Sequence, residues 1–402
     1  MVEAMEVQKG YKKTEVGIIP DDWEVKTLGD VGDVKMCRRV FNHETQSEGT
    51  IPFYKIGTFG KEADAYIAES HYNNYRQRFS FPKKGDILIS AAGTIGRTLI
   101  YDGKPAYFQD SNIVWIDNKE SLISNNFLYH VFQVVKYNTE GGTIQRLYNN
   151  ILRSTKFICP PTKAEQNAIA EALNDADALI SELEKLIAKK KAIKQGAMQE
   201  LLKPKEGWEV NKLGEICQIL KGKGLSKSQL DEYGNSDCLL YGELFTTYKE
   251  VIAEVVSRTN SKEGLDSKYG DILFPGSTTT IGIDLAKASS ILIGNVKLGG
   301  DIIILRKKDY EYNSEFAAYF LNIIKRNEIA QNAKGVTIYH LHGKDLVDIE
   351  IFFPSIEIQT RIAQILSDMD KEIESLEKKL DKYKMLKQGM MQNLLTGKIR
   401  LI

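Results

Sequence analysis

The sequence predicts a mixed α/β fold, made of two similar small α/β domains joined by a long antiparallel two-helix coiled coil. The first observation is an internal repeat: Trp23-Glu24-Val25 returns as Trp208-Glu209-Val210, and Gly85-Asp86-Ile87-Leu88 returns as Gly270-Asp271-Ile272-Leu273, each 185 residues later. The second observation is a heptad pattern that follows each copy. Solenoid units are only about 20 to 50 residues long, so this repeat indicates a tandem pair of domains.

The repeat continues through the rest of the chain with small changes in spacing. The offset is 194 residues at Thr143-Ile144 and Thr337-Ile338, so the second copy gains nine residues in its middle. It is 193 residues for Lys194-Gln195-Gly196, which returns as Lys387-Gln388-Gly389. The two copies therefore share both their mixed part and their helical part.

The composition is that of a globular protein without a disulfide or zinc framework. With 402 residues, 42% of them hydrophobic, the chain can bury two ordinary cores. Its four cysteines form no Cys-x-x-Cys pair. It has neither a signal-peptide pattern nor an apolar run of the roughly 20 residues that span a bilayer, so we expect a cytoplasmic protein. The 54 basic and 54 acidic residues cancel, which argues against a free-standing DNA-binding protein because phosphate attraction usually requires excess Lys and Arg.

Each mixed part is predicted to contain short strands, a helix and a final strand that ends at proline. We expect Ser124 and Ser314 to be the N-caps of the two helices. The strands are short apolar runs between Gly, Asp and Asn turn signals. They are expected at 87–89, 113–116 and 157–159 in the first copy, and at 272–274, 302–305 and 351–353 in the second.

The two longest predicted elements are helices that follow the mixed parts. Thr162 and Glu165 form a capping-box pattern at the start of the first, and Ser355 occupies the same place in the second. Lys203-Pro204 and Thr396-Gly397 end the two segments. Each helix is therefore about 40 residues and about 60 Å long at 1.5 Å per residue.

Apolar residues step by four and three along both long segments, which is the heptad seam of a coiled coil. A narrow seam requires a partner, and each helix is the obvious partner of the other. Because the first helix leads from one domain to the next and the second leads away from it, paired helices must run antiparallel. The seam residues are Ile169, Leu173, Ala176, Ile180, Leu183 and Ile187 in the first, and Ile362, Leu366, Met369, Ile373, Leu376, Leu380 and Tyr383 in the second.

Several motifs occur in a fixed order along the chain. They are the opening run from Val16 to Val25, Gly85-Asp86-Ile87-Leu88-Ile89-Ser90 with Gly93-Thr94-Ile95-Gly96, Glu165-Gln166, and the run from Leu394 to Leu401. In this order they resemble the specificity subunit of type I restriction-modification systems. The second long helix starts Ser355-Ile356-Glu357-Ile358-Gln359, where the family usually has Glu directly before Gln.

The resemblance implies a non-catalytic subunit with two target recognition domains, each reading one half of an interrupted DNA sequence, and two helical regions that space them. The implied partners are double-stranded DNA, two methyltransferase subunits and restriction subunits. S-adenosylmethionine would bind the methyltransferase subunits, and this chain would hold no cofactor and no metal. The implied recognition domains are 1–160, with an N-terminal extension at 1–16, and 206–353, and the helical regions are 161–205 and 354–402.

Some segments look like catalytic motifs, but the repeat argues against each. The acids within 20–26 are too close together to surround a metal, and the second copy has Asn211 in place of Lys26. Phe274-Pro275-Gly276-Ser277 resembles a methyl-donor loop, but the first copy has an unrelated sequence there. A stand-alone methyltransferase or nuclease is therefore one rival function, and a coiled-coil scaffold with protein-binding heads is the other.

Two histidines form the last such segment. His340 and His342 can lie on one face of a strand, as metal ligands do. Arg146 stands in place of His340 in the first copy, and a cation there excludes a metal site shared by both domains. We expect these residues to make polar contacts instead.

Polar residues at matched places in the two copies are the candidates for DNA contact. Arg and Gln make bidentate bonds to base edges, and Ser and Thr bond bases or phosphates. For any one residue, simple solvation is the commoner alternative, and the lysine-rich runs at 189–194 and 378–387 are predicted to be solvated or partner-binding helix faces. The matched candidates are Arg38 with Lys223 in Gly222-Lys223-Gly224, Arg97 with Ser277, Thr278 and Thr279, and Gln145-Arg146 with Tyr339-His340.

Overall fold

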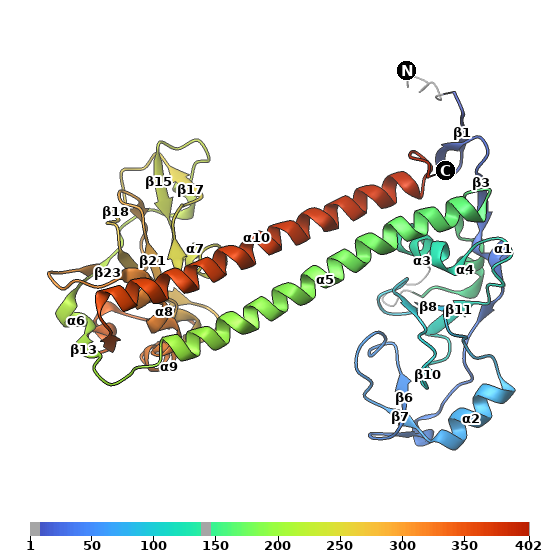
Figure 1. Ribbon diagram of the computed structural model, residues 1–402, viewed down its shortest axis with the longest axis horizontal. Helices are drawn as coiled ribbons and strands as arrows, with labels where there is room; N and C mark the ends of the chain where they lie inside the picture. Colours follow the sequence, from blue (N-terminus) through green and yellow to red (C-terminus); the bar gives the residue numbers. More distant parts are fainter. Residues whose placement is uncertain (1–8, 138–145, 402) are drawn as a thin grey trace. The chain divides into compact units, whose positions relative to one another are not determined.

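The computed structural model describes residues 9–137 and 146–401, which form two compact units. The first unit is Met1–Leu183 together with Lys379–Ile402, and the second is Glu184–Lys378. Each unit contains one mixed α/β domain and a part of each long helix (Figure 1). No helix within the described ranges is long and apolar enough to cross a membrane.

The domain of the first unit consists of small sheets connected by short helices. Its strands are β1 (Tyr11–Thr14), β2 (Gly17–Pro20), β3 (Glu24–Thr27), β4 (Val34–Lys35), β5 (Thr45–Gln46), β6 (Ile51–Tyr54), β7 (Tyr66–Ile67), β8 (Ile87–Ser90), β9 (Thr98–Ile100), β10 (Tyr107–Phe108), β11 (Ile113–Ile116) and β12 (Lys156–Cys159). Its helices are α1 (Leu28–Val31), η1 (Asn42–Glu44), α2 (Glu69–Arg78), α3 (Asn125–Val134) and α4 (Asn149–Ser154). The two four-stranded sheets have the orders β4-β11-β8-β9 and β10-β6-β7-β5, while β1 pairs with β2 and β3 with β12.

The domain of the second unit has the same kinds of sheet. Its strands are β13 (Glu209–Lys212), β14 (Cys217–Lys221), β15 (Ser236–Leu239), β16 (Val251–Ile252), β17 (Ser257–Thr259), β18 (Leu265–Asp266), β19 (Asp271–Pro275), β20 (Ser277–Thr278), β21 (Ser289–Ile291), β22 (Lys297–Leu298), β23 (Ile302–Lys307), β24 (Lys334–Gly335), β25 (Tyr339–His340) and β26 (Glu350–Phe353). Its helices are α6 (Leu213–Ile216), η2 (Lys227–Gln229), α7 (Glu243–Thr246), η3 (Gly282–Leu285), α8 (Ser314–Ile323), α9 (Arg326–Gln331) and η4 (Gly343–Leu346). The sheet orders are β14-β23-β19-β21-β16, β17-β15-β22-β18 and β20-β25-β24, and β13 pairs with β26.

Strand pairing confirms that the two domains are copies of one fold. Leu88 lies opposite Trp115 in the first unit, and Leu273, its repeat counterpart, lies opposite Ile304 in the second. A parallel strand pair also recurs in the second sheet of each domain, β6 with β10 and β15 with β22, and the second domain has a further parallel pair, β16 with β21. The domains differ in the segment before the Gly-Asp-Ile-Leu motif: after β7 the first domain has helix α2, and after β17 the second has the short strand β18.

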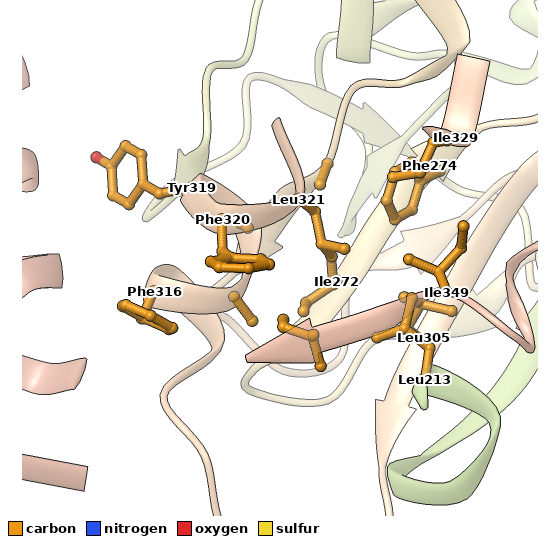
Figure 2. Close-up of a cluster of buried hydrophobic side chains, with 14 of the residues drawn as sticks. Leu213, Ile272, Phe274, Leu305, Phe316, Tyr319, Phe320, Leu321, Ile329 and Ile349 are labelled. Atoms are coloured by element: carbon orange, nitrogen blue, oxygen red, sulfur yellow. The ribbon is translucent and has the colours of Figure 1, made fainter. Parts of the chain in front are cut away.

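Each unit buries its own hydrophobic core. In the second unit, Phe316 and Phe320 of α8 pack in the same cluster as Ile272 and Leu305 of the sheet (Figure 2). Burying one such side chain contributes about 1.5 to 3 kcal/mol relative to exposure. The aromatic residues that the sequence places on the helix after each central sheet therefore hold that helix against the strands.

The last described residues complete the core of the first unit. Leu394 and Leu395 belong to the same buried cluster as Trp23. The guanidinium of Arg400 lies 5.4 Å from the Trp23 ring and donates to both Asp22 carboxylate oxygens, at 2.9 and 3.0 Å. The other partner of Arg400 is Glu165, at 2.9 Å from Nη2 to Oε2. Residues from both ends of the chain thus form one packed region.

The predicted long helices are present and end close to the expected residues. They are α5 (Lys163–Leu201) and α10 (Ile356–Leu394), each 39 residues long. In the second unit, Lys190 pairs with Glu372 at 2.6 Å and Lys194 with Asp370 at 2.6 Å. As the residue number rises along α5, from Lys190 to Lys194, the number of the paired residue falls along α10, from Glu372 to Asp370. The two helix segments are therefore antiparallel in this unit.

The predicted seam is buried or half-buried along both helices. Ile169, Leu173, Leu183, Ile187, Ile362, Leu366 and Ile373 are buried, whereas Ala176, Ile180, Met369, Leu376, Leu380 and Tyr383 are half-buried. One of the ion pairs beside the seam is repeated in both units: Lys194 with Asp370 in the second, and its repeat counterpart Lys387 with Asp177, at 2.5 Å, in the first. Part of each predicted lysine-rich face is therefore bound to the opposite helix.

Helix caps follow the sequence prediction in two cases and differ in two. Ser124 caps α3 by accepting a hydrogen bond from the Phe127 N–H, and Thr162 Oγ1 accepts from the Glu165 N–H at 3.2 Å. The predicted cap Ser314 is wrong, because Asn313 caps α8 and Ser314 is already helical. The Glu165 side chain does not close a capping box, since Arg400 binds it.

Candidate nucleic-acid interface

The two segments predicted to contact DNA lie side by side in each unit. In the first unit, Ala92 pairs with Arg146 in an isolated antiparallel bridge, and the Leu147 N–H donates to the Ala91 carbonyl at 2.9 Å. In the second unit, Ser277 pairs with His340. The sequence repeat matches Ala92 with Ser277 and Arg146 with His340, so the same bridge occurs in both domains.

The second unit extends this bridge into the small sheet β20-β25-β24. Thr278 lies opposite Tyr339, and the Leu341 N–H donates to the Gly276 carbonyl at 2.9 Å, as Leu147 does in the first unit. The sheet borders a cleft of about 950 Å³. Ser277, Thr278, Thr279 and His340 all line that cleft.

Asp301, whose carboxylate binds two neighbouring side chains, also lines this cleft. The Ser277 hydroxyl donates to Asp301 Oδ2 at 2.7 Å, and Lys221 Nζ lies 3.1 Å from Asp301 Oδ1. Burial opposes ionisation of Asp301, but the hydrogen bonds from Ser277 and Lys221, together with the nearby positive charge, lower the pKa of the carboxyl below its usual value. Asp301 also has a φ of 60°, a conformation that non-glycine residues rarely adopt and that is frequent at functional sites.

His340 and His342 lie on one face, as the sequence predicts. Their rings are 6.2 Å apart and parallel within 1°. In residues 9–137 and 146–401, no group of three His, Cys, Asp or Glu side chains is arranged to hold a metal ion. The two imidazoles therefore form an exposed stacked pair beside the cleft, available for polar contacts.

The first unit has a smaller cleft at the corresponding bridge. It has a volume of about 350 Å³, and Arg39, Lys55, Asn112 and Arg146 are among its lining residues. Arg146 is exposed, whereas Arg39 Nε is held 2.9 Å from the Asp110 carboxylate. Gln145, the other predicted residue here, lies outside the described residues.

Arg97 and Arg38 have different environments. The Arg97 guanidinium is half-buried, donates to the Ile56 carbonyl at 3.2 Å and lies 5.5 Å from the Phe59 ring. It is bound within its own domain, which favours a role in positioning its loop. Arg38 is exposed and lies 5.3 Å from the Phe79 ring. Its guanidinium edge is accessible to a partner.

The glycines beside Lys223 have a structural explanation within the chain itself. A Cβ on Gly222 would lie 1.9 Å from the Gly299 carbonyl oxygen, so only glycine fits there. Lys223 is exposed, and its role in phosphate contact remains a prediction. Thr279 is exposed too, while Thr280 is tied to Asp284 by a hydrogen bond.

A glutamine in each unit, which the sequence offered only as part of the repeat, links the long helix to its domain. Gln166 Oε1 accepts from the Ser124 N–H at 3.1 Å, and Gln359 Oε1 accepts from the Asn313 N–H at 2.9 Å. Their amide groups donate to Pro160 and Pro354 carbonyls. Each glutamine thus fixes the N-cap residue of α3 or α8 to the start of a long helix.

Comparison with known proteins places this architecture in a family. The sequence model for the type I restriction modification DNA specificity domain matches residues 20–195 and again residues 205–384. The chain belongs to this family. The two matches coincide with the two copies of the repeat, so each copy is one specificity domain.

Individual relatives and solved structures agree with this assignment. A putative type I restriction enzyme specificity subunit of Haemophilus influenzae is 55% identical over 177 residues, which cover 44% of this chain and 46% of that protein. The putative MjaX specificity subunit of Methanocaldococcus jannaschii is 27% identical over 98% of this chain and 97% of its own length. A crystal structure of the type I S subunit from M. genitalium has a TM-score of 0.61 at 16% identity, covering 93% of this chain and 96% of that one. A chain from a structure on assembly of the type I system has a TM-score of 0.54 at 16% identity, covering 95% and 99%.

Proposed function

We propose that this chain is the DNA specificity subunit of a type I restriction-modification complex and that each unit reads one half of an interrupted target. The observation that carries the proposal is the matched bridge, Ala92 with Arg146 and Ser277 with His340. A protein that has the same bridge with polar side chains in each of two domains can place one bridge at each half of an interrupted DNA target. The different side chains of the two bridges suit two different half-sequences, because base readout depends on the donors and acceptors presented.

The proposal assigns the chemistry to partners. Two methyltransferase subunits would bind S-adenosylmethionine and dock on the helices, and restriction subunits would join the complete complex. Exposed apolar residues at matched places support one docking site per unit: Ile193, 47% exposed, in the second unit and Leu386, 53% exposed, in the first. Leu186 lies seven residues before Ile193 on the same helix, as in a seam that receives another helix.

The zero net charge fits this division of labour. If the methyltransferase subunits supply much of the phosphate contact, this chain needs only local basic residues. The isolated chain is then expected to bind DNA weakly at physiological salt. Tight binding by the purified chain alone would contradict this part of the proposal.

The experiment that tests the proposal changes the length of the two helices. Four residues in helical register are inserted after Leu183 and after Leu376, which lengthens each helix by about 6 Å and rotates it by about 40°. B-DNA advances by about 3.4 Å and about 34 to 36° per base pair. To match the added helix length, the gap between the two half-sites needs nearly two extra base pairs. To match the added rotation, it needs one.

The expected result is selection of the same two half-sequences with a gap that is longer by one or two base pairs. The measurement is selection from randomised DNA by the complex assembled with methyltransferase subunits, before and after insertion. An unchanged gap, or changed half-sequences, would show that the helices do not set the distance. A coiled-coil scaffold with protein-binding heads would select no sequence in either form.

A further inference from the structure

Helix α2 of the first unit presents one face made of uncharged polar residues and a single arginine. Ser70, Asn73, Asn74, Gln77 and Arg78 follow one another at the spacing i, i+3, i+4, i+7 and i+8, which places them on one side of a helix. All five are exposed. Only Tyr72 of this ten-residue helix is buried.

The chemistry of this face differs from that of a solvated helix surface. The exposed faces of α5 and α10 are rich in Lys and Glu, which favour helices and solubility. Asn and Ser disfavour a helix interior because their side chains compete with the backbone for hydrogen bonds. The face contains no acid, since Glu69, the only acid of α2, lies beside it.

The polar groups of this face are unused within the described part of the chain. In residues 9–137 and 146–401, the side chains of Asn73, Asn74 and Gln77 have no hydrogen-bond partner. Each amide carries both a donor and an acceptor. The helix thus presents three free amides together.

Aromatic residues fix the opposite side of α2. The Tyr75 hydroxyl donates to Glu44 Oε1 at 2.8 Å, and its ring lies 5.9 Å from the Tyr107 ring. The Tyr72 ring meets Phe81 edge-on at 5.7 Å. These contacts hold the orientation of the helix, as a base-reading element requires.

The polar face is continuous with the predicted DNA-binding surface. Phe79, directly after α2, lies between two guanidinium groups, 5.3 Å from Arg38 and 5.8 Å from Arg78. The neighbouring Arg39 lines the same cleft as Arg146. Arg78 and Arg38 therefore connect α2 to the residue next to this cleft, and the exposed Arg38, Arg78 and Arg146 carry a charge that is complementary to a phosphate backbone.

We infer that α2 is a recognition helix that enters the major groove of the half-site read by the first unit. This inference rests on the proposed function. B-DNA admits one α-helix in its major groove, and Asn and Gln bind adenine through N6 and N7. Asn73 and Gln77, one turn apart, would read adenines, while Arg78 would bind guanine or a phosphate. The second unit has β18 in this part of the chain and reads its half-site by other means.

The experiment uses the complex assembled with methyltransferase subunits and its target selected from randomised DNA. The double variant Asn73→Ala and Gln77→Ala is expected to lose adenine preference at one or two positions of one half-site and to keep the other half-site. Affinity for the original target should fall about 5- to 150-fold for each lost contact. In addition, 7-deazaadenine at those positions, which lacks the N7 acceptor, should weaken wild-type binding but not binding by the variant.

The variants are designed to keep the fold. Alanine favours a helix more than Asn or Gln, so α2 should persist, as thermal unfolding would show. Gln199→Ala, on an exposed position of α5, is the matched control and should leave selection unchanged. Selection of an unchanged sequence by the double variant, or a 7-deazaadenine effect that persists in it, would overturn the role of α2. A uniform loss for all sequences would show phosphate contact and would overturn base reading. If the wild-type complex selects no sequence, the proposed function itself fails.

Discussion

The shared Gly-Asp-Ile-Leu motif occupies the same place in both units, but its aspartate has a different electrostatic environment in each. Asp271 is bound by Arg306, with Nε and Nη2 at 3.0 and 2.7 Å from its two oxygens. The strand register aligns Trp115 with Ile304, so Asp117 occupies the place of Arg306 in the first unit. Asp86 therefore lacks the arginine. Burial raises the pKa of its carboxyl above the usual value, and Asp117 adds to the effect.

The function that the two aspartates share is local. The Asp86 carboxylate accepts the Lys83 N–H at 2.7 Å, and the Asp271 carboxylate accepts the Lys268 N–H at 2.8 Å. Each side chain closes the turn that leads into the central strand. The repeated motif therefore preserves the turn, whereas only the second domain pairs the aspartate of the motif with an arginine.

The largest expected effect follows from removing this charge in each unit. Asp271→Asn leaves the Arg306 guanidinium mostly buried without its counter-ion, and such a loss costs about 3 to 5 kcal/mol. Asp86→Asn keeps an oxygen that can accept the turn hydrogen bond and removes a charge without a cation, so it should change stability by less than about 1 kcal/mol. Denaturant unfolding of the full chain, followed in each unit by native-state hydrogen exchange, measures both. Equal losses would show that the motif has the same energetic role in the two domains.

The ion pairs between the long helices should show a smaller difference. Lys194 and Asp370 have side chains 11% and 19% exposed, whereas Lys387 and Asp177 are 18% and 38% exposed. The Tyr319 hydroxyl also donates to Asp370 at 2.8 Å. Lys194→Met should therefore cost about 2 to 3 kcal/mol and Lys387→Met about 1 kcal/mol. Tyr319→Phe should reduce the difference in stability loss between Lys194→Met and Lys387→Met. A double-mutant cycle of Tyr319→Phe with Lys194→Met measures this reduction.

The matched glutamines should differ less. Gln166 has two partners more than Gln359, since its amide also donates to the Leu122 carbonyl at 3.1 Å and to the Cys159 sulfur at 3.6 Å. Gln166→Ala should cost about 1 kcal/mol more than Gln359→Ala, because the partly buried Leu122 carbonyl also loses its donor. Hydrogen exchange of the first turns of α3 and α8 reports each loss locally. Greater loss of protection in α8 would contradict the expected order.

The smallest expected effect is a pH dependence that Asp86 gives to the stability of the first unit. Because the folded pKa of Asp86 exceeds its ordinary value of 3.8, the folded unit binds this proton more tightly than the unfolded chain. The contribution to stability is complete below 3.8 and is lost as the pH rises through the higher folded pKa. Asp86→Asn should remove that loss, so its stability relative to wild type should increase with pH from 3.8 upward. A constant difference across this range would refute the assignment.

Local features could be predicted from the sequence, but features that depend on distant contacts could not. Thr162, the seam from Ile169 to Ile187 and the ends of α5 follow from patterns within a few turns. The cap at Asn313 was missed because Ser314 is also a good cap residue, and only backbone geometry distinguishes them. The Asp271 and Arg306 pair depends on strand register across 35 residues.

In the candidate site, too, some features could be predicted from the sequence and others could not. The repeat identified the two segments of each bridge, although Ala92 and Arg146 are far apart in sequence, because matched polar residues select the same places twice. The face of α2 was missed because the second copy has no such helix and therefore gave no match. The density of Asn, Gln and Arg in residues 73–78 was the available signal, and it is a compositional signal only.

The packing of Leu394, Leu395 and Arg400 against Trp23, Asp22 and Glu165 has a consequence for the order of folding during synthesis. Domains usually fold as the ribosome releases them, the N-terminal one first. Here the second unit is one continuous segment, Glu184–Lys378, whereas the first lacks part of its core until residues after 378 have been made. All residues of the second unit therefore leave the ribosome before the last core residues of the first unit do, so the N-terminal domain is expected to complete its core last.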